Sequence, residues 1–225
     1  MSIPSAFFVD PPGDLPKRER TRRQLLRAAV GVLHERGVGG FAAQEVAAAA
    51  GMANGTFYNY FPTREALLAA LAEELVESYC RHIDASYAHI EDAAERMAIG
   101  GRRYVLFAVE SPDWARLMLG LLDGGAPLLQ RIAPFALRDL RLGVRQKRFR
   151  ISSERAAMDL IAGTGLQAMR TVLSGAAGRA HASAAATLVL RGLGMDYDEA
   201  AEVARRPLPP LRVELPTLPR SRRVS

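Results

Sequence analysis

Apolar residues recur along most of the chain at the three- and four-residue spacing that is typical of amphipathic helices, and no run alternates like a strand. The segment that begins at Thr21 places apolar residues at i, i+3, i+4, i+7 and i+8, and the segment after Pro62 carries four leucines on one helical stripe. We therefore predict an all-α protein. Its helices are expected near 21–36, 43–50, 64–83, 87–109, 112–122, 126–147, 153–174, 180–193 and 197–204, with a further short helix that ends near Tyr60.

Breakers and capping residues divide the chain into domains. Gly37 stands where the first helix would need a left-handed C-terminal cap, and Thr63, which follows the chain-breaking Pro62, is a suitable N-cap for the long fourth helix. Four prolines precede Lys17, and five follow Arg206. We predict a flexible N-terminal arm over 1–16, helical domains over 17–64 and 65–204, and a Pro/Arg-rich tail over 205–225.

The net charge of +6 lies mainly in two arms. Residues 1–36 carry +3 and residues 205–225 carry +5, whereas residues 37–204 hold 17 basic and 19 acidic groups. This distribution indicates local contact with a polyanion. The chain has neither an apolar run of 18 residues nor a secretory leader, so we expect a cytoplasmic protein with no membrane partner. The single Cys80 excludes an intramolecular disulfide.

Residues 43–61 have the spacing of a helix-turn-helix. A small residue at Ala47 lets two short helices approach, Gly51 accepts a positive φ at the turn, and Phe57 fills the space between the helices. Such a unit holds its second helix away from the body, where it can enter the major groove of DNA.

In order and spacing, residues 21–71 resemble the DNA-binding domain of the tetracycline-repressor (TetR) family of bacterial regulators. The family implies an all-helical homodimer with an N-terminal three-helix DNA-binding domain. Its C-terminal domain pairs the subunits and usually encloses a small effector. The matching residues are Ala28-Ala29, Gly37, Phe41, Val46-Ala47, Ala50-Gly51, Gly55 to Phe61, and Arg64 to Leu68.

The resemblance also implies which residues contact DNA. Asn54 is expected to cap the recognition helix, the hydroxyls of that helix suit phosphate oxygens, and Asn59 is the best candidate for reading a base edge. Phe57 and Phe61 are expected in the core instead. For the N-terminal arginines, DNA contact and a solvated basic face remain equally open. The predicted DNA-binding residues are Arg22, Gln44, Ala53, Asn54, Thr56, Tyr58, Asn59, Tyr60 and Arg64.

One position departs from the family pattern. The second helix of the family usually begins with a Thr or Ser cap, but Ala42 and Ala43 occupy that region here. We therefore expect one capping hydrogen bond, worth roughly 1 kcal/mol, to be absent, and Gln44 to replace the phosphate contact normally made there.

The C-terminal two-thirds of the chain carry a weaker signal. Gly163 and Gly165, followed by an alanine-rich segment, suggest two helices that approach closely. In the family the corresponding helices form a four-helix bundle between subunits, so we assign 153–174 and 180–193 to a homodimer interface. A symmetric dimer presents two recognition helices to successive major grooves, which predicts a palindromic or near-palindromic operator.

Candidate effector-binding residues are large and mostly apolar, and each of them also suits an ordinary core position. A basic stripe at 138, 141, 145 and 148 has two interpretations, a site for an acidic ligand or a solvated helix face. We find no catalytic arrangement, no metal-ligand spacing and no cofactor motif. The six ligand-binding candidates are Tyr104, Phe107, Trp114, Met118, Phe135 and Met169, and the stripe consists of Arg138, Arg141, Arg145 and Arg148.

The sequence therefore predicts a dimeric, non-enzymatic transcriptional regulator. We expect it to repress from a palindromic operator on double-stranded DNA and to release that operator when a small organic molecule fills the C-terminal domain. Two alternatives stay open, an effectorless DNA-binding protein and a helical ligand carrier or enzyme that does not bind DNA.

Overall fold

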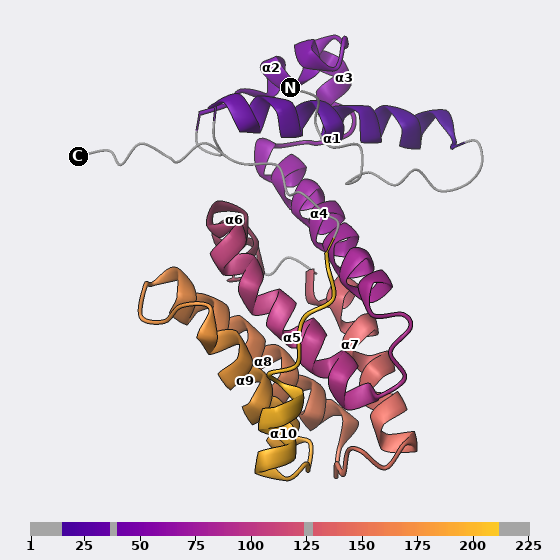
Figure 1. The fold of residues 1–225 in the computed structure, drawn as a ribbon. Coiled ribbons are helices and arrows are strands. Elements are labelled where there is room, and N and C mark those ends of the chain that lie inside the picture. The colour runs from indigo at the N-terminus through magenta and orange to yellow at the C-terminus, as the bar shows by residue number, and fades with distance from the viewer. Residues whose placement is uncertain (1–14, 37–39, 124–127, 212–225) are drawn as a thin grey trace. The chain divides into compact units, whose positions relative to one another are not determined.

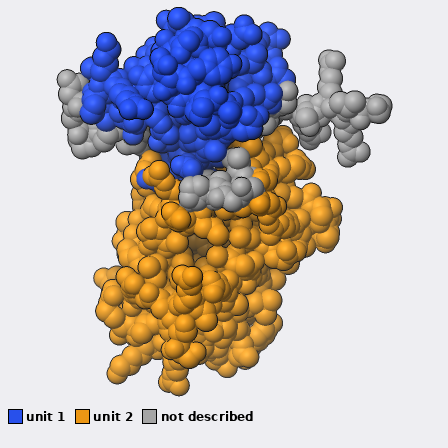
Figure 2. Space-filling model, turned by 180° about the vertical axis from the view of Figure 1, so that it is seen from behind, with its two compact units in different colours: residues 1–78, 213–225 blue, residues 79–212 orange. Residues whose placement is uncertain are grey.

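The computed structural model describes residues 15–36, 40–123 and 128–211, and within these ranges it contains helices and no strand (Figure 1). The chain divides into two compact units, unit 1 up to Ser78 and unit 2 from Tyr79 (Figure 2). The helices are α1 (Lys17–Arg36), α2 (Ala43–Ala49), α3 (Asn54–Tyr58), α4 (Arg64–Ser86), α5 (Ala93–Glu110), α6 (Pro112–Asp123), α7 (Leu128–Arg145), α8 (Glu154–Leu173), α9 (Ala180–Gly192) and α10 (Tyr197–Val203).

The predicted all-α class is confirmed, and most helix limits agree with the sequence pattern. The N-cap at Thr63 is confirmed because its hydroxyl accepts a hydrogen bond from the Ala66 amide at 3.1 Å. The prediction of a helix from residue 87 is wrong at its start. That helix begins at Ala93, because the Asp92 carboxylate accepts from the Ala94 amide at 3.0 Å and caps it there. Gly37 and the arm over 1–14 lie outside the described residues.

Unit 1 has a small aliphatic and aromatic core. Leu25, Leu33 and Leu67 are fully buried, and Phe57 fills the centre of the unit with 0% exposure. The side-chain amide of Gln24 on α1 donates to the Ala50 carbonyl at 2.8 Å, which ties α1 to the turn after α2. Unit 1 thus includes the first part of α4, whereas the sequence placed the domain limit between residues 64 and 65.

Unit 2 is built around α5, which packs against α6, α7, α8 and α9. One buried cluster joins the N-terminal half of α5 to α9 and α10 through Met97, Leu190 and Val203. A second cluster, which includes Val105 and Leu106, joins the other half of α5 to α8 and α9. These contacts bury the small residues that the sequence places on α5 and α9.

Residues 205–211 lie along α5. The Arg102 guanidinium donates to the Arg206 carbonyl at 2.6 Å, and Arg103 donates to the Pro209 carbonyl. Leu208 packs against the cluster that contains Val105 and Leu106. The first part of the predicted tail is therefore held by α5, and residues 212–225 lie outside the described residues.

The turn after α7 depends on a close contact. Gly143 is packed against the Phe149 ring, so that a Cβ at this position would lie 2.1 Å from Phe149 Cδ2. The Gly143 carbonyl also accepts from the Arg148 and Phe149 amides at 2.9 and 3.1 Å. Lys147, the residue before Arg148, adopts a left-handed φ of 59°. Phe149 is 2% exposed and belongs to the buried cluster that joins α5, α9 and α10.

The change Gly143→Ala is expected to lower the free energy of unfolding of unit 2 by about 1–3 kcal/mol, the typical effect of overpacking. Gly120→Ala is the matched control, because Gly120 lies inside α6 with nothing within 4 Å of the added methyl group. That variant should be neutral or more stable by up to about 1 kcal/mol. Urea unfolding followed by the fluorescence of Trp114 measures both, and equal stabilities would contradict the prediction.

Candidate functional site

The two short helices of unit 1 form a helix-turn-helix. Gly51 has a φ of 68° at the turn, and the Met52 amide donates to the Ala47 carbonyl at 2.8 Å. The missing cap of α2 is confirmed, since no side chain caps this helix at Ala42. The Glu45 carboxylate instead accepts from the Ala42 amide at 2.8 Å and also pairs with Arg36 at 3.3 Å. These contacts hold the start of α2 in place of the usual hydroxyl.

The predicted cap of the recognition helix is wrong. Asn54 is the first residue of α3, and Ala53 occupies the N-cap position with φ −68° and ψ 148°. The Ala53 carbonyl accepts from the Thr56 amide at 2.9 Å, but no side chain caps the helix. The Asn54 side chain is exposed, so it is left available to an external partner.

The aromatic residues of α3 and its C-terminal flank divide into two groups. Phe57 and Phe61 are 0% and 3% exposed, with ring centroids 5.9 Å apart, which confirms their predicted place in the core. Tyr58 is 52% exposed and meets Phe57 edge-on at 5.3 Å. Asn59 is exposed and Tyr60 is half-buried. The buried pair anchors a short helix whose other face carries polar side chains.

Seven of the nine predicted DNA-binding residues lie on α2, α3 or the residues that flank α3. Gln44, Ala53, Asn54, Tyr58 and Asn59 are exposed, while Thr56 and Tyr60 are half-buried.

The two arginines of the predicted set are tied to unit 1 instead. Arg22 lies 3.7 Å from Glu74 and 5.7 Å from the centre of the Phe61 ring. Arg64 stacks on Phe41 at 4.6 Å. Gln24 was not predicted from the sequence, because its role depends on the Ala50 carbonyl, 26 residues away.

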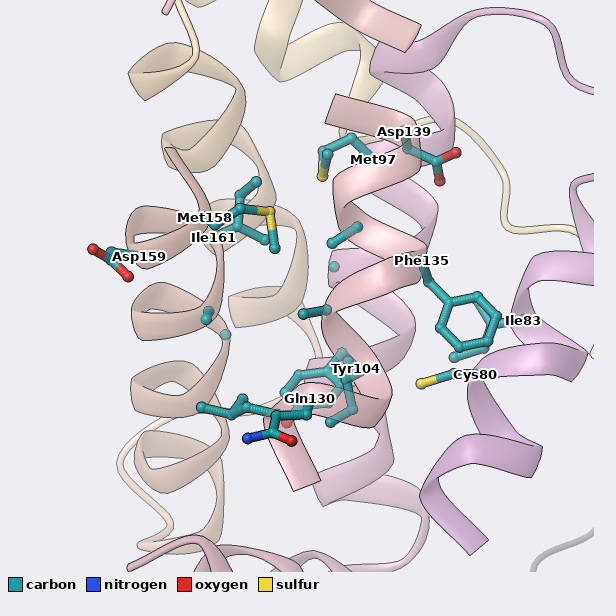
Figure 3. Close-up of a pocket in the computed structure, with 18 of the residues that line it drawn as sticks. Cys80, Ile83, Met97, Tyr104, Gln130, Phe135, Asp139, Met158, Asp159 and Ile161 are labelled. Atoms are coloured by element: carbon teal, nitrogen blue, oxygen red, sulfur yellow. The ribbon is translucent and has the colours of Figure 1, made fainter. Parts of the chain in front are cut away.

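Unit 2 contains a cavity of about 420 Å³ (Figure 3). Its lining comes from the end of α4, from α5, α7 and α8, and from Tyr87. Most lining groups are apolar or small, including Ile83, Met97, Phe135 and Ile161. The volume and the apolar walls are typical of sites for small organic molecules.

Only two of the six predicted ligand-binding residues, Tyr104 and Phe135, line this cavity. The other four are at most 4% exposed and belong to the surrounding core, where Phe107 packs against Tyr79 with ring centroids 4.9 Å apart. The Met118 sulfur lies 4.0 Å from the Tyr104 hydroxyl. Trp114 and Met169 are likewise core residues outside the lining.

The polar lining groups Gln130, Asp139, Arg155 and Asp159 were not among the residues predicted from the sequence. The spacing of the lining residues along α7 and α8 follows one helical face, and this periodicity was the available signal.

A charged network stands beside the cavity at Asp139, which is 2% exposed. Its carboxylate pairs with Arg96 at 2.9 Å and Arg138 at 3.0 Å, and it accepts from the Tyr87 hydroxyl at 2.9 Å. Arg138 also binds both oxygens of Asp84. Hydrogen bonds from Arg138 lower the pKa of Asp84, and burial raises the pKa of Tyr87. Two acidic and two basic groups thus neutralise one another.

The predicted basic stripe is mostly engaged in ion pairs within the chain. Arg141 forms two hydrogen bonds with Glu154, at 2.7 and 2.8 Å, and Arg148 pairs with Asp92 and Glu199. Arg138 belongs to the network at Asp139, and Arg145 is exposed in the last turn of α7. This arrangement does not resemble a site for an acidic ligand.

Within the part of the chain that the structure describes, no group of three or more His, Cys, Asp and Glu residues is placed to hold a metal ion. None of the described helices is both long and apolar enough to span a bilayer.

Comparison with known proteins identifies both parts of the chain. Residues 25–71 match the family profile described as bacterial regulatory proteins, tetR family, and residues 92–206 match a tetracyclin repressor-like C-terminal domain. The crystal structure of RolR in complex with resorcinol superposes on this chain with a TM-score of 0.76. The two sequences are 36% identical, and the match covers 87% of this chain and 98% of the RolR chain. A TetR-family regulator from Pectobacterium atrosepticum is 28% identical over 79% of this chain and 95% of its own, with a TM-score of 0.67.

Curated relatives match over shorter stretches. The nucleoid occlusion factor SlmA of Haemophilus ducreyi is 27% identical over 57% of this chain and 66% of its own length. The repressor DhaR of Mycobacterium sp. strain GP1 is 29% identical over 46% of this chain and half of its own length. The profile matches, the likeness to RolR and the helix-turn-helix together place this chain in the TetR family of DNA-binding transcriptional regulators.

Proposed function

We propose that the protein is a homodimeric repressor that occupies a palindromic operator and releases it when a small organic molecule enters the cavity of unit 2. The observation that carries the DNA-binding part is the division of α3 and its flank into the buried Phe57 and Phe61 and the exposed Tyr58 and Asn59. Such an anchored helix can enter a major groove without losing its fold.

Helices α8 and α9 support the proposed dimer. Only Ala157, Ala168 and Met169 of the 20 residues of α8 are buried within the chain, and Leu188 on α9 is 63% exposed. Apolar and small positions left exposed on two neighbouring helices suit a four-helix bundle with the same helices of a second subunit. The two recognition helices of such a dimer would bind two half-sites about one helical turn of DNA apart.

The cavity supports control by an effector and counts against the effectorless alternative. RolR, which shares this fold at 36% identity, is known in complex with resorcinol, and DhaR is a repressor. A ligand that favours one arrangement of the dimer would shift the population away from the DNA-binding form, by no more than its differential affinity for the two forms. The non-DNA-binding carrier or enzyme is left without a specific observation in its favour.

Selection of bound fragments from the source genome tests the operator directly. The full chain, incubated with sheared genomic DNA at moderate salt, is expected to enrich fragments that share one inverted repeat. Failure to enrich any motif would overturn the proposed function, and enrichment of a single asymmetric half-site would overturn the dimeric arrangement.

Two substitutions in and beside α3 should have different effects. Tyr58→Phe removes a hydroxyl suited to phosphate, so it should weaken binding to all sequences alike, by several-fold. Asn59→Ala should relax the preference at one position per half-site, a loss of about 1–3 kcal/mol of discrimination. Titration of a set of operator variants by fluorescence anisotropy measures both effects.

Tyr197→Phe is the matched control for this pair, since Tyr197 is an exposed tyrosine of α10, remote in sequence from the helix-turn-helix. It should leave every affinity unchanged. A uniform loss for Asn59→Ala, equal at all positions of the operator, would contradict its assignment as the base-reading residue.

A further inference from the structure

The charges around the cavity are balanced, which restricts what the cavity can bind. Asp139 is neutralised by Arg96 and Arg138, and the second acidic partner of those arginines is Asp84. The other charged lining residues, Arg155 and Asp159, are of opposite sign and four residues apart on α8. Both of these residues are exposed to solvent, so a charged ligand inside the cavity would find no uncompensated buried charge, and its desolvation is costly.

Two polar side chains of the lining are not committed to strong hydrogen bonds. Among the residues that the structure describes, the Tyr104 hydroxyl has only the Met118 sulfur within reach, at 4.0 Å, and thioether sulfur is a weak acceptor. Gln130 is exposed to solvent, and its carboxamide has no hydrogen-bond partner among the described residues. Both side chains line the cavity, from α5 and α7 respectively (Figure 3). A tyrosine hydroxyl keeps its proton at neutral pH, and burial raises the pKa of Tyr104 further.

These two groups are remote from the charged network. Gln130 and Asp139 are nine residues apart on α7, which corresponds to roughly 13 Å along a helix. The Tyr104 ring lies against Gly165 of α8, where a Cβ would come within 3.3 Å of Tyr104 Cδ1. Gly165 therefore leaves room for this ring at the cavity wall. The aromatic and aliphatic groups between the two ends, such as Phe135, Ile132 and Met158, suit an apolar ligand body.

We propose that the effector is an uncharged, mainly apolar molecule with a hydroxyl or carbonyl group, and that Tyr104 and Gln130 determine specificity by hydrogen-bonding that group. This inference rests on the proposed effector-controlled function and adds the chemical class of the ligand and the residues that select it.

Three probes that share one ring system test the inference, namely naphthol, methylnaphthalene and naphthoate. Isothermal titration calorimetry on the full chain at pH 7, without DNA, is expected to show naphthol as the tightest ligand. Naphthoate should bind at least about tenfold more weakly because its carboxylate must be desolvated. Tyr104→Phe and Gln130→Leu should each weaken naphthol binding by roughly three- to tenfold, the effect of one hydrogen bond, and leave methylnaphthalene unchanged.

Tyr79→Phe provides the matched control. The Tyr79 hydroxyl is also buried, but it donates to the Arg103 carbonyl at 3.2 Å and does not line the cavity. This variant should bind all three probes as the parent does. Naphthoate binding as tightly as naphthol, unchanged naphthol affinity in both cavity variants, or no binding of any probe would each overturn the inference.

Operator binding is measured separately on the same preparations. A chain that binds its operator but fails these ligand tests would contradict only the ligand class, whereas a chain that binds naphthol as expected but enriches no operator would contradict only the proposed function.

Discussion

Phe57→Ala is expected to weaken operator binding at least tenfold by destabilising unit 1. Phe57 is 0% exposed at the centre of the helix-turn-helix, where it contacts Phe61 and the edge of Tyr58. Truncation of a buried phenylalanine to alanine costs about 3–5 kcal/mol, through lost burial and the cavity left behind. A small domain has little stability in reserve, so this loss is comparable to its whole free energy of unfolding.

The two units allow this effect to be localised. Trp114 is the single tryptophan, is 4% exposed and belongs to unit 2, so its fluorescence reports unit 2. In urea, Phe57→Ala should lose part of its helical circular dichroism early while the Trp114 transition moves far less. Operator affinity should fall at least tenfold.

Tyr58→Ala is the control, because Tyr58 is 52% exposed. Its stability should stay within about 0.5 kcal/mol of the parent, although its operator affinity falls. Normal operator binding by a folded Phe57→Ala protein would contradict the assigned role of this residue.

The second large effect is expected at Asp139. Asp139→Ala removes the 2.9 Å ion pair of Arg96, whose side chain is 12% exposed, and leaves Asp84 at 3.8 Å as a more distant carboxylate. It also removes the acceptor that lies 2.9 Å from the buried Tyr87 hydroxyl. Removing one partner from a buried charge network costs about 3–5 kcal/mol, since the remaining charge is not compensated. Urea unfolding followed by Trp114 fluorescence should show this loss in unit 2.

Asp113→Ala is the matched control for that change. Asp113 pairs with Arg116 at 2.9 Å on the surface of α6, where the two side chains are 30% and 57% exposed. Such a pair contributes at most about 0.5–1 kcal/mol. If the two variants lost similar amounts of stability, the network at Asp139 would not be the stabilising element described above.

Local patterns were sufficient to predict much of the fold. The leucine stripe of α4, the breakers Pro62 and Pro112, and the small residues around Gly51 act within a few residues of one another, so their consequences can be derived from sequence alone. The burial of Phe57 and Phe61 followed from the same spacing. The prediction that Asn54 caps α3 was wrong by one position, since the N-cap is Ala53. Residue propensity alone does not fix the first residue of a helix.

The cavity could not be predicted in the same way. Tyr87 follows α4 and Asp139 lies on α7, 52 residues further along the chain, so only the tertiary fold brings them to one hydrogen bond. The candidates Trp114 and Met169 are large apolar residues, as many of the lining residues are, but they are buried in the core and do not line the cavity. The stripe of arginines was also ambiguous, because its acidic partners, such as Glu154 and Glu199, lie on other helices.

The attachment of residues 205–211 to α5 has an evolutionary consequence. Arg102 and Arg103 bind main-chain carbonyls, and a carbonyl is present whatever side chain the residue carries. Sequence drift at Pro207 and Pro209 is therefore expected to be tolerated while the chain keeps its path. Selection should act instead on Arg102 and Arg103. Homologues that share this attachment should therefore be recognised by an Arg-Arg pair on α5 more readily than by the sequence of the segment that corresponds to residues 205–211.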